Sequence, residues 1–276
     1  MKKVLFSVIA SFLVILAFAQ QHSLVKVWET DSVMKVPESV LPDIKRKVLY
    51  VANIDGTDPW AKDDKGSIGK IGLDGKIINI EWVRGLNAPK GMGIFKNNLY
   101  VADITDVVVI DIEKGEIKKR IPVPNAEGLN DITVDPKGVV YVSDSKAKRV
   151  YMVKGDVANP HLEGLQAPNG VLWHKENLYV LDKGGLYRVE YDRKLTKLAD
   201  GMEGGTDGVE PVYDKEYIVS GWAGVIYYVF ADGTKEILLD TRNEKKNTAD
   251  IGYDPATRMV YVPTFWRNSV VAYELK

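Results

Sequence analysis

A short apolar run built around one aromatic or Ile position recurs along most of the chain. The first copy is Val48 to Ala52, and its length and β-branched composition are typical of a buried strand. The central residues of the six copies lie 38 to 50 residues apart and are Tyr50, Tyr100, Tyr141, Tyr179, Ile218 and Tyr261. Because a repeat of about 40–50 residues is typical of propeller blades, the pattern predicts six repeated units.

Turn residues divide each unit into short strands. Asp135-Pro136 separates two apolar runs and favours a type I turn, whereas Asp74-Gly75 and Asp232-Gly233 have the composition of hairpin turns. No stretch shows sustained helical periodicity, and a parallel sheet would need crossover helices between its strands. We therefore predict an all-β fold, a six-bladed β-propeller with four antiparallel strands in each blade.

The two ends of the repeat array predict how the ring closes. After Tyr261 the chain has room for one further strand, Ser269 to Leu275, so the last blade lacks its outer strand. Leu24 to Glu29 is a strand-like run that belongs to none of the six units. We expect this N-terminal strand to complete the last blade, because closure of the ring protects the sheet edges.

Residues 1–19 have the pattern of a secretory signal peptide. Lys2 and Lys3 precede an apolar run from Val4 to Phe18, and the run ends on a small-x-small cleavage pattern at Ala17 to Ala19. The run is shorter than the ~20 apolar residues that span a bilayer. We therefore expect a signal peptide over 1–19, one propeller domain over 20–276, no membrane span after cleavage, and a periplasmic or secreted protein.

The composition excludes several kinds of site. The 276 residues include 37 basic and 38 acidic side chains, so no basic field exists to attract nucleic acid. The chain has no Cys, which excludes thiolate zinc sites, iron–sulfur clusters, disulfides and cysteine nucleophiles. Any metal must therefore have oxygen or imidazole ligands. We expect a monomer whose partner is a small-molecule substrate.

A polar residue lies ten to twelve positions before each repeated aromatic position. The first strand of a propeller blade lines the central channel, so these residues would form a ring around the axis. The ring residues are Glu38, Lys90, Asn130, Asn169, Asp207 and Asp250. Carboxylate and amide oxygens are the ligands that Ca²⁺ prefers, and four ring residues, Glu38, Asn130, Asn169 and Asp207, would supply them. The alternative is a polar lining around a water-filled tunnel.

The sequence around these residues resembles a known family. Gly128 to Gly138 is GLNDITVDPKG, Ala167 to Val171 is APNGV, and Asp207 precedes Gly208. From Glu38 to Leu275 the chain resembles the senescence marker protein, gluconolactonase and luciferin-regenerating enzyme family of calcium-dependent phosphotriesterase-like propellers. The resemblance implies a lactone or ester hydrolase with one axial divalent cation, Ca²⁺ first and Zn²⁺, Mg²⁺ or Mn²⁺ as alternatives. It implies the metal ligands Glu38, Asn169 and Asp207, with Asn130 as a further metal or substrate contact.

The implied chemistry gives Asp207 a second role and leaves Lys90 unexplained. The cation would polarise the carbonyl while Asp207 takes a proton from the attacking water. Lys90 departs from the family pattern, and it would either pair with Asp250 or occupy the axis in place of the metal. In the second case the protein is a non-catalytic propeller that binds a small ligand or a protein partner. The histidines, His22, His161 and His174, form no recognisable catalytic dyad.

Three tryptophans are candidate substrate contacts. Trp60 lies in the longest insertion, Asn53 to Gly66, and loops of this size often cover binding sites. Trp222 and Trp266 follow the fifth and sixth repeated strands, where the chain leaves one face of the ring. We assign Trp60, Trp222 and Trp266, together with Lys90 and Asp250, to substrate binding. The alternative for each tryptophan is packing between blades.

Overall fold

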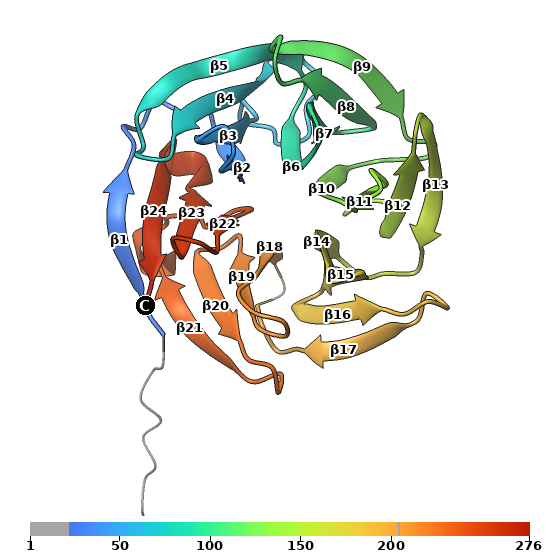
Figure 1. Cartoon of the computed structure of the whole chain (residues 1–276), viewed down its shortest axis with the longest axis vertical. Coiled ribbons are helices and arrows are strands. Elements are labelled where there is room, and N and C mark those ends of the chain that lie inside the picture. The colour runs from blue at the N-terminus through green and yellow to red at the C-terminus, as the bar shows by residue number, and fades with distance from the viewer. Residues whose placement is uncertain (1–21, 204) are drawn as a thin grey trace, which may run out of the picture.

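Each of the six repeated apolar runs forms the second strand of a four-stranded antiparallel sheet. The computed structural model describes residues 22–203 and 205–276, and its six sheets surround one central axis (Figure 1). In blades 1 to 5 the strands follow one another in chain order across the sheet. The predicted six-bladed β-propeller with four antiparallel strands per blade is confirmed.

The blades are numbered along the chain. Blade 1 contains β2 (Pro37–Asp43), β3 (Val48–Asn53), β4 (Gly66–Gly72) and β5 (Ile77–Leu86). Blade 2 contains β6 (Pro89–Phe95), β7 (Asn98–Asp103), β8 (Asp106–Asp111) and β9 (Glu116–Pro122). Blade 3 contains β10 (Leu129–Val134), β11 (Val140–Asp144), β12 (Arg149–Lys154) and β13 (Val157–Leu162).

The second half of the ring follows the same order. Blade 4 contains β14 (Pro168–His174), β15 (Asn177–Asp182), β16 (Gly185–Val189) and β17 (Leu195–Ala199). Blade 5 contains β18 (Thr206–Pro211), β19 (Tyr217–Gly221), β20 (Val225–Val229) and β21 (Lys235–Asp240). Blade 6 contains β22 (Gly252–Asp254), β23 (Met259–Pro263), β24 (Val270–Leu275) and β1 (Leu24–Glu29). Two single turns of 3-10 helix, η1 (Arg242–Glu244) and η2 (Phe265–Arg267), complete the described elements.

The hydrophobic core lies between neighbouring blades. Every residue of β3, β11 and β19 is buried, because each of these second strands has another blade on both faces. Six apolar clusters fill the six spaces between blades, and the cluster between blades 1 and 2 contains Tyr50, Ile68, Leu99 and Val101. In contrast, the outer strand β9 buries only Ile121 fully. The strength of the ring therefore comes from contacts between blades.

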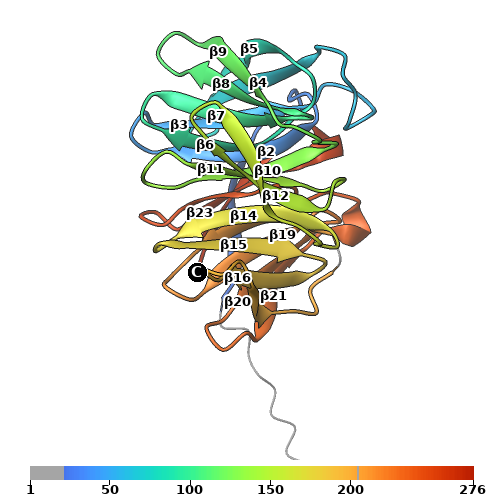
Figure 2. The same cartoon turned by 90° about the vertical axis from the view of Figure 1, so that its right-hand side faces the viewer.

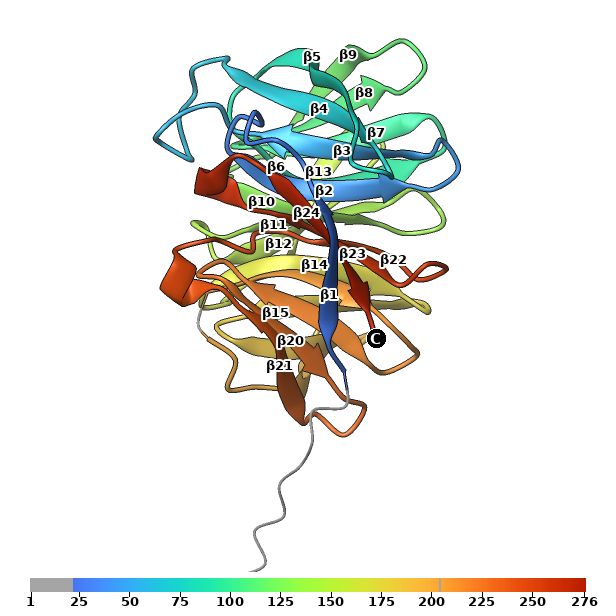
Figure 3. The ribbon, with the colours of Figure 1, turned by 90° about the vertical axis from the view of Figure 1, so that its left-hand side faces the viewer.

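The N-terminal strand closes the ring, as predicted. β1 pairs antiparallel with β24, from Leu24 opposite Leu275 to Glu29 opposite Val271 (Figure 3). Near the axis, the Asp250 amide donates to the Glu38 carbonyl at 2.9 Å, and the Val40 amide donates to the Asp250 carbonyl at 3.2 Å. First and last blades are thus joined at both their outer and inner edges.

One face of the ring carries the longest loop and both short helices. The loop between β3 and β4 and the turns η1 and η2 all project from the same side (Figures 2 and 3). The inner strands begin at this face, because each second strand ends there and runs antiparallel to the first. Residues at the start of the inner strands therefore lie beneath these loops.

The expected signal peptide, residues 1–19, lies outside the described residues and stays a prediction. Within the described ranges, no helix is both long enough and apolar enough to cross a bilayer.

Trp28 of β1 tests whether the closing strand stabilises the whole ring. Its indole Nε1 donates to the Leu73 carbonyl of blade 1 at 3.2 Å, and its ring packs against Tyr261 of blade 6. We expect Trp28→Ala to lower the free energy of unfolding by about 2 kcal/mol, since the ring is half-buried. Urea denaturation followed by circular dichroism should show one cooperative transition at lower urea.

The control is Val27→Ala, because Val27 lies on the same strand and is 53% exposed. We expect a change of less than about 0.5 kcal/mol. A separate early transition in the Trp28→Ala protein would mean that β1 frays alone and does not hold the ring.

Candidate functional site

The predicted ring residues lie where the inner strands are irregular. In β2, β6, β10, β14 and β18, the register with the second strand shifts just after the first paired residue. Such a β-bulge re-aims a side chain relative to the sheet. Each shift contains the predicted ring residue of its blade: Glu38, Lys90, Asn130, Asn169 and Asp207.

Buried Asp residues fix the backbone that leads into three of these positions. Asp103, Asp144 and Asp182 end the second strands of blades 2, 3 and 4, and each carboxylate accepts two consecutive backbone amides. The amides are those of Asn87 and Ala88 for Asp103, Glu127 and Gly128 for Asp144, and Gln166 and Ala167 for Asp182, at 2.6 to 3.0 Å. The sequence pattern did not identify these residues, although each lies three positions after the repeated Tyr.

The five irregular positions converge on one pocket. Their side chains line a cavity of about 260 Å³ whose other walls are Pro59, Trp60, Gly205, Trp222 and Phe265. This volume lies just below the roughly 300–1,000 Å³ of clefts that hold drug-sized ligands, so the pocket suits a small molecule. The predicted grouping of Glu38, Lys90, Asn130, Asn169 and Asp207 is therefore seen in space.

Two buried oxygens in this pocket have no hydrogen-bond donor among the described residues. The Asn169 amide Nδ2 donates to Asp207 Oδ1 at 2.8 Å, which leaves Asn169 Oδ1 without a partner. Glu38 Oε2 is likewise buried and unpartnered. Burial raises the pKa of the Glu38 carboxyl well above its usual range, although Lys90 opposes this. Burial, and next the charge of Asp250, raise the pKa of Asp207 to about 8.

Asn130 is oriented by a serine of its own blade, which is held in turn by the neighbouring blade. Its amide Nδ2 donates to Ser145 Oγ at 3.0 Å, and Ser145 Oγ in turn donates to the Pro168 carbonyl at 2.7 Å. The amide nitrogen is thereby occupied, and the Asn130 carbonyl oxygen remains available to a ligand. Glu38, Asn130, Asn169 and Asp207 together present acceptors that the described residues do not saturate.

Lys90 does not form the ion pair with Asp250 that we considered. Its ammonium donates to the Pro59 carbonyl at 2.8 Å and lies 4.4 Å from the centre of the Trp60 ring. Among the described residues, no carboxylate oxygen lies within 4.0 Å of this ammonium. Burial lowers the pKa of Lys90, whereas the nearby charges of Glu38 and Asp207 raise it.

Asp250 lies one layer deeper in the channel than expected. Its Oδ2 accepts the Ser39 hydroxyl at 2.6 Å, and it lines a second cavity of about 220 Å³ with Asp131 and Glu210. Asp131 accepts the Val171 amide at 2.7 Å. A side chain at Gly91 or Gly208 would clash with Asp131 or Asp250, so these glycines make room for the deeper carboxylates. Burial raises the pKa of Asp250 to about 7.

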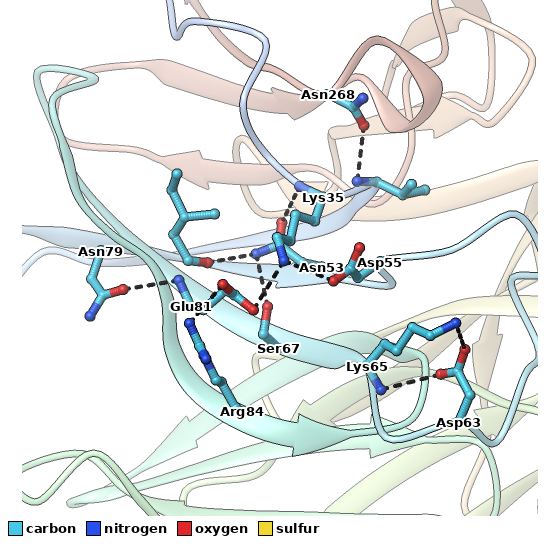
Figure 4. Close-up of polar contacts among 12 residues, drawn as sticks. Lys35, Asn53, Asp55, Asp63, Lys65, Ser67, Asn79, Glu81, Arg84 and Asn268 are labelled. Carbon is cyan, nitrogen blue, oxygen red and sulfur yellow. Dashed lines mark hydrogen bonds and ion pairs between the residues drawn. The ribbon is translucent and has the colours of Figure 1, made fainter.

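The loop between β3 and β4 forms one wall of the pocket. At its base, Asn53 Nδ2 donates to the Ile80 carbonyl at 2.9 Å, and Lys35 pairs with Asp55 at 2.9 Å and Glu81 at 3.1 Å (Figure 4). Farther along, Lys62 Nζ donates to Thr105 Oγ1 of blade 2 at 2.9 Å. These contacts fix the loop at both ends.

Trp60 is held against the mouth of the channel. It packs on an apolar cluster that includes Ile54, Ile104 and Phe265. A side chain at Gly128 would clash with the Trp60 ring, so this glycine lets the loop approach blade 3. Lys146 of blade 3 is exposed and places its ammonium 4.4 Å from the same ring. Neither Gly128 nor Lys146 was a predicted site residue.

The aromatic residues that blades 5 and 6 contribute to the pocket differ in part from the prediction. Trp222 lines the pocket, and its ring meets Phe265 edge-on at 5.4 Å. Trp266 does not line the pocket: it is 43% exposed and packs edge-on against Phe265 at 4.7 Å. The turn η2 is responsible, because it directs Phe265 inward and Trp266 outward. The only sequence signal for Phe265 as a pocket residue was that it lies directly before Trp266.

The histidines lie away from this pocket. His22 stacks on Tyr228 at 3.8 Å and pairs with Glu236, while His161 packs against Tyr141. His174 ends β14. In the described ranges, no three side chains drawn only from His, Cys, Asp and Glu are grouped to hold a metal. Any cation in the axial pocket would therefore depend on the Asn carbonyls as well.

Comparison with known proteins shows the fold alone. No protein-family model and no curated protein matches the chain. Streptogramin B lyase is similar in structure, with a TM-score of 0.66 and 10% identity over 92% of this chain and 97% of that one. Virginiamycin B lyase from Staphylococcus aureus gives 0.65 and 12% over 92% and 99%. A chain of the nidogen–laminin complex gives 0.66 and 16% over 79% and 84%.

The raised carboxyl pKa values predict how the stability of metal-free protein depends on pH. With pKa values of about 8 and about 7, Asp207 and Asp250 hold protons that ordinary carboxyls, with a pKa near 4, have lost. The folded chain then binds more protons than the unfolded chain, so stability falls as pH rises from about 4 to about 8. Urea denaturation in EDTA at several pH values measures this slope.

Asp207→Asn should make the slope shallower, because the amide has no proton to lose. The control Asp232→Asn changes an exposed turn carboxylate and should leave the slope unchanged. An identical slope in the wild-type and Asp207→Asn proteins would contradict the prediction.

Proposed function

We propose that the axial pocket holds one divalent cation and that the protein hydrolyses lactones or related cyclic esters. The observation that carries the proposal is the pair of buried unpartnered oxygens, Glu38 Oε2 and Asn169 Oδ1, in the same pocket as Asp207. The motifs around Asn130, Asn169 and Asp207 support it, since they resemble the senescence marker protein, gluconolactonase and luciferin-regenerating enzyme family.

The donor set suits a hard cation. Glu38, Asn130, Asn169 and Asp207 would supply carboxylate and amide oxygens, which favour Ca²⁺ over Zn²⁺. Calcium takes six to eight oxygen ligands, so positions remain for water and substrate. Two carboxylates balance two positive charges, and this would remove the cost of burying them without partners. Mg²⁺ and Mn²⁺ are the next candidates.

The cation and Asp207 would have different roles in hydrolysis of the ester. A bound cation would polarise the lactone carbonyl and stabilise negative charge on its oxygen. Asp207 Oδ1 accepts the Asn169 amide, so Oδ2 is the oxygen that would take the proton of the attacking water. The water oxygen bonds to the carbonyl carbon, and the ring C–O bond breaks. The proton taken by Asp207 would pass to the departing ring oxygen, and the new carboxylic acid would release the second proton of the water to solvent, which gives a hydroxycarboxylate.

A second function is ligand binding without catalysis, and Lys90 is the observation that favours it. Its buried ammonium shares the pocket with Glu38 and Asp207, so it supplies positive charge near the position proposed for the cation. If it replaces the cation, the pocket would bind a small ligand or a partner's side chain. The two functions differ in whether purified protein contains a metal.

The metal content and lactone turnover of two Asp207 variants test the proposed hydrolase. We expect one Ca²⁺ per wild-type chain by elemental analysis, and turnover of a lactone panel in a pH-indicator assay. Asp207→Ala should lower calcium affinity more than about 100-fold, because it removes a ligand. Asp207→Asn should retain much of that affinity but lose turnover, since its amide oxygen can bind calcium but cannot accept the proton.

Asp232→Ala serves as the matched control, because Asp232 lies in the exposed turn between β20 and β21. Its calcium content and turnover should equal those of the wild type. A metal-free wild-type protein that is inert toward every lactone would exclude the hydrolase and favour the ligand-binding function.

A further inference from the structure

The Lys90 ammonium has N–H donors inside the pocket that the described residues do not use. Its side chain is 2% exposed, and it is the cation that lines this cavity within the described residues. An ammonium carries three N–H donors, and here one donates to the Pro59 carbonyl. The Trp60 ring stabilises the charge from one side, but no carboxylate oxygen of the described residues lies within 4.0 Å. A buried ammonium in this state lacks an anion.

The charges around Lys90 leave room for one negative group on a ligand. A bound divalent cation would balance the charges of Glu38 and Asp207, and the charge of Lys90 would then be left over. Asp103 also acts on Lys90, but it is occupied by two backbone amides and by Arg120 at 3.1 Å. The exposed ammonium of Lys146, over the same Trp60 ring, adds positive charge at the mouth.

The pocket lining contains aromatic residues as well as Lys90. Lys90 and Trp60 form one side, while Trp222 and Phe265 are the aromatic residues from blades 5 and 6. We therefore expect a small ring to contact these aromatic residues, with its carbonyl toward the cation that Glu38 and Asp207 would hold and an acidic substituent toward Lys90.

We propose that Lys90 is a specificity-determining residue that binds a carboxylate on the substrate, so the substrate class is small lactones that carry an acid group. This inference rests on the proposed lactone hydrolysis and names its substrate class. It gives Lys90 a positive role beside the cation, in contrast to the idea that the lysine replaces the metal.

Two pairs of compounds test the inference, each an acid and its neutral amide of the same shape. The first pair is γ-butyrolactone-γ-carboxylate and the corresponding carboxamide, compared by kcat/KM. The second is a cyclopentanone carboxylate and its carboxamide, ring ketones that cannot be hydrolysed, compared by isothermal titration calorimetry in the presence of Ca²⁺. We expect the acid to be preferred by roughly 10- to 100-fold in both, as for a charged hydrogen bond.

Variants at Lys90 and Lys62 assign the preference to one side chain. Lys90→Met should reduce the acid-to-amide ratio to about one, and Lys90→Arg should retain part of it. Lys62→Met is the control, because Lys62 anchors the same loop through Thr105 without lining the pocket. Its ratio should match that of the wild type, which separates loss of charge from loosening of the loop.

The outcomes distinguish this inference from the proposed function. An acid-to-amide ratio near one in the wild-type protein, in turnover and in calorimetry, overturns the role of Lys90 whether or not the variants fold. A wild-type protein that contains calcium and hydrolyses the neutral lactone would in that case still support the hydrolase. Preferential binding of the ketone acid by a metal-free protein that is inert toward both lactones and toward the lactone panel would retain the anion subsite and exclude the hydrolase.

Discussion

Every blade of this ring depends on its two neighbours to bury both faces of its second strand. The strands β3, β11 and β19 contain no exposed residue, and their apolar partners come from adjacent sheets. A sheet of this kind cannot be stable alone, since its own strands cover only its edges. The stability of the fold therefore depends on all six interfaces between blades, and the interface between blades 1 and 6 must be packed as closely as the others.

The candidate site lies in the central channel, where no neighbouring sheet packs. Between the start of the inner strands and the axis there are no neighbouring sheets, and bulges at these positions turn polar side chains toward one another. Gathering Glu38, Asp207 and Lys90 there costs free energy of desolvation. The ring can bear this cost because its stability comes from the six clusters between blades.

The repeat in the sequence determined most of the fold but less of the site. The spacing of Tyr50, Tyr100 and Tyr141 predicts blades, and the spare strand Leu24 to Glu29 predicts closure, because both depend on local strand patterns. Five of six ring positions converge as predicted. Asp250 does not, because β22 begins only at Gly252 and the Asp250 backbone pairs instead with Ser39 of blade 1. Such register differences of one layer are set by contacts between blades.

The spacing of the repeats could not predict the contacts of Lys90 or the aromatic residues that line the pocket. Lys90 contacts Pro59 and Trp60, which belong to a loop of the preceding blade, and no periodic pattern encodes where such a loop rests. Phe265 lines the pocket in place of Trp266 because one turn of 3-10 helix directs Phe265 inward. The Asp residues that end β7, β11 and β15 could have been identified from the sequence, since each lies three positions after the repeated Tyr.

The deeper layer of the channel repeats itself after half a circle. Asp131 of blade 3 fills the space left by Gly91 and bonds to the backbone of blade 4, and Asp250 of blade 6 fills the space left by Gly208 and bonds to Ser39 of blade 1. The two arrangements lie three blades apart. Each of these glycines therefore fixes the position of a buried carboxylate in the next blade, and any side chain placed there would displace it.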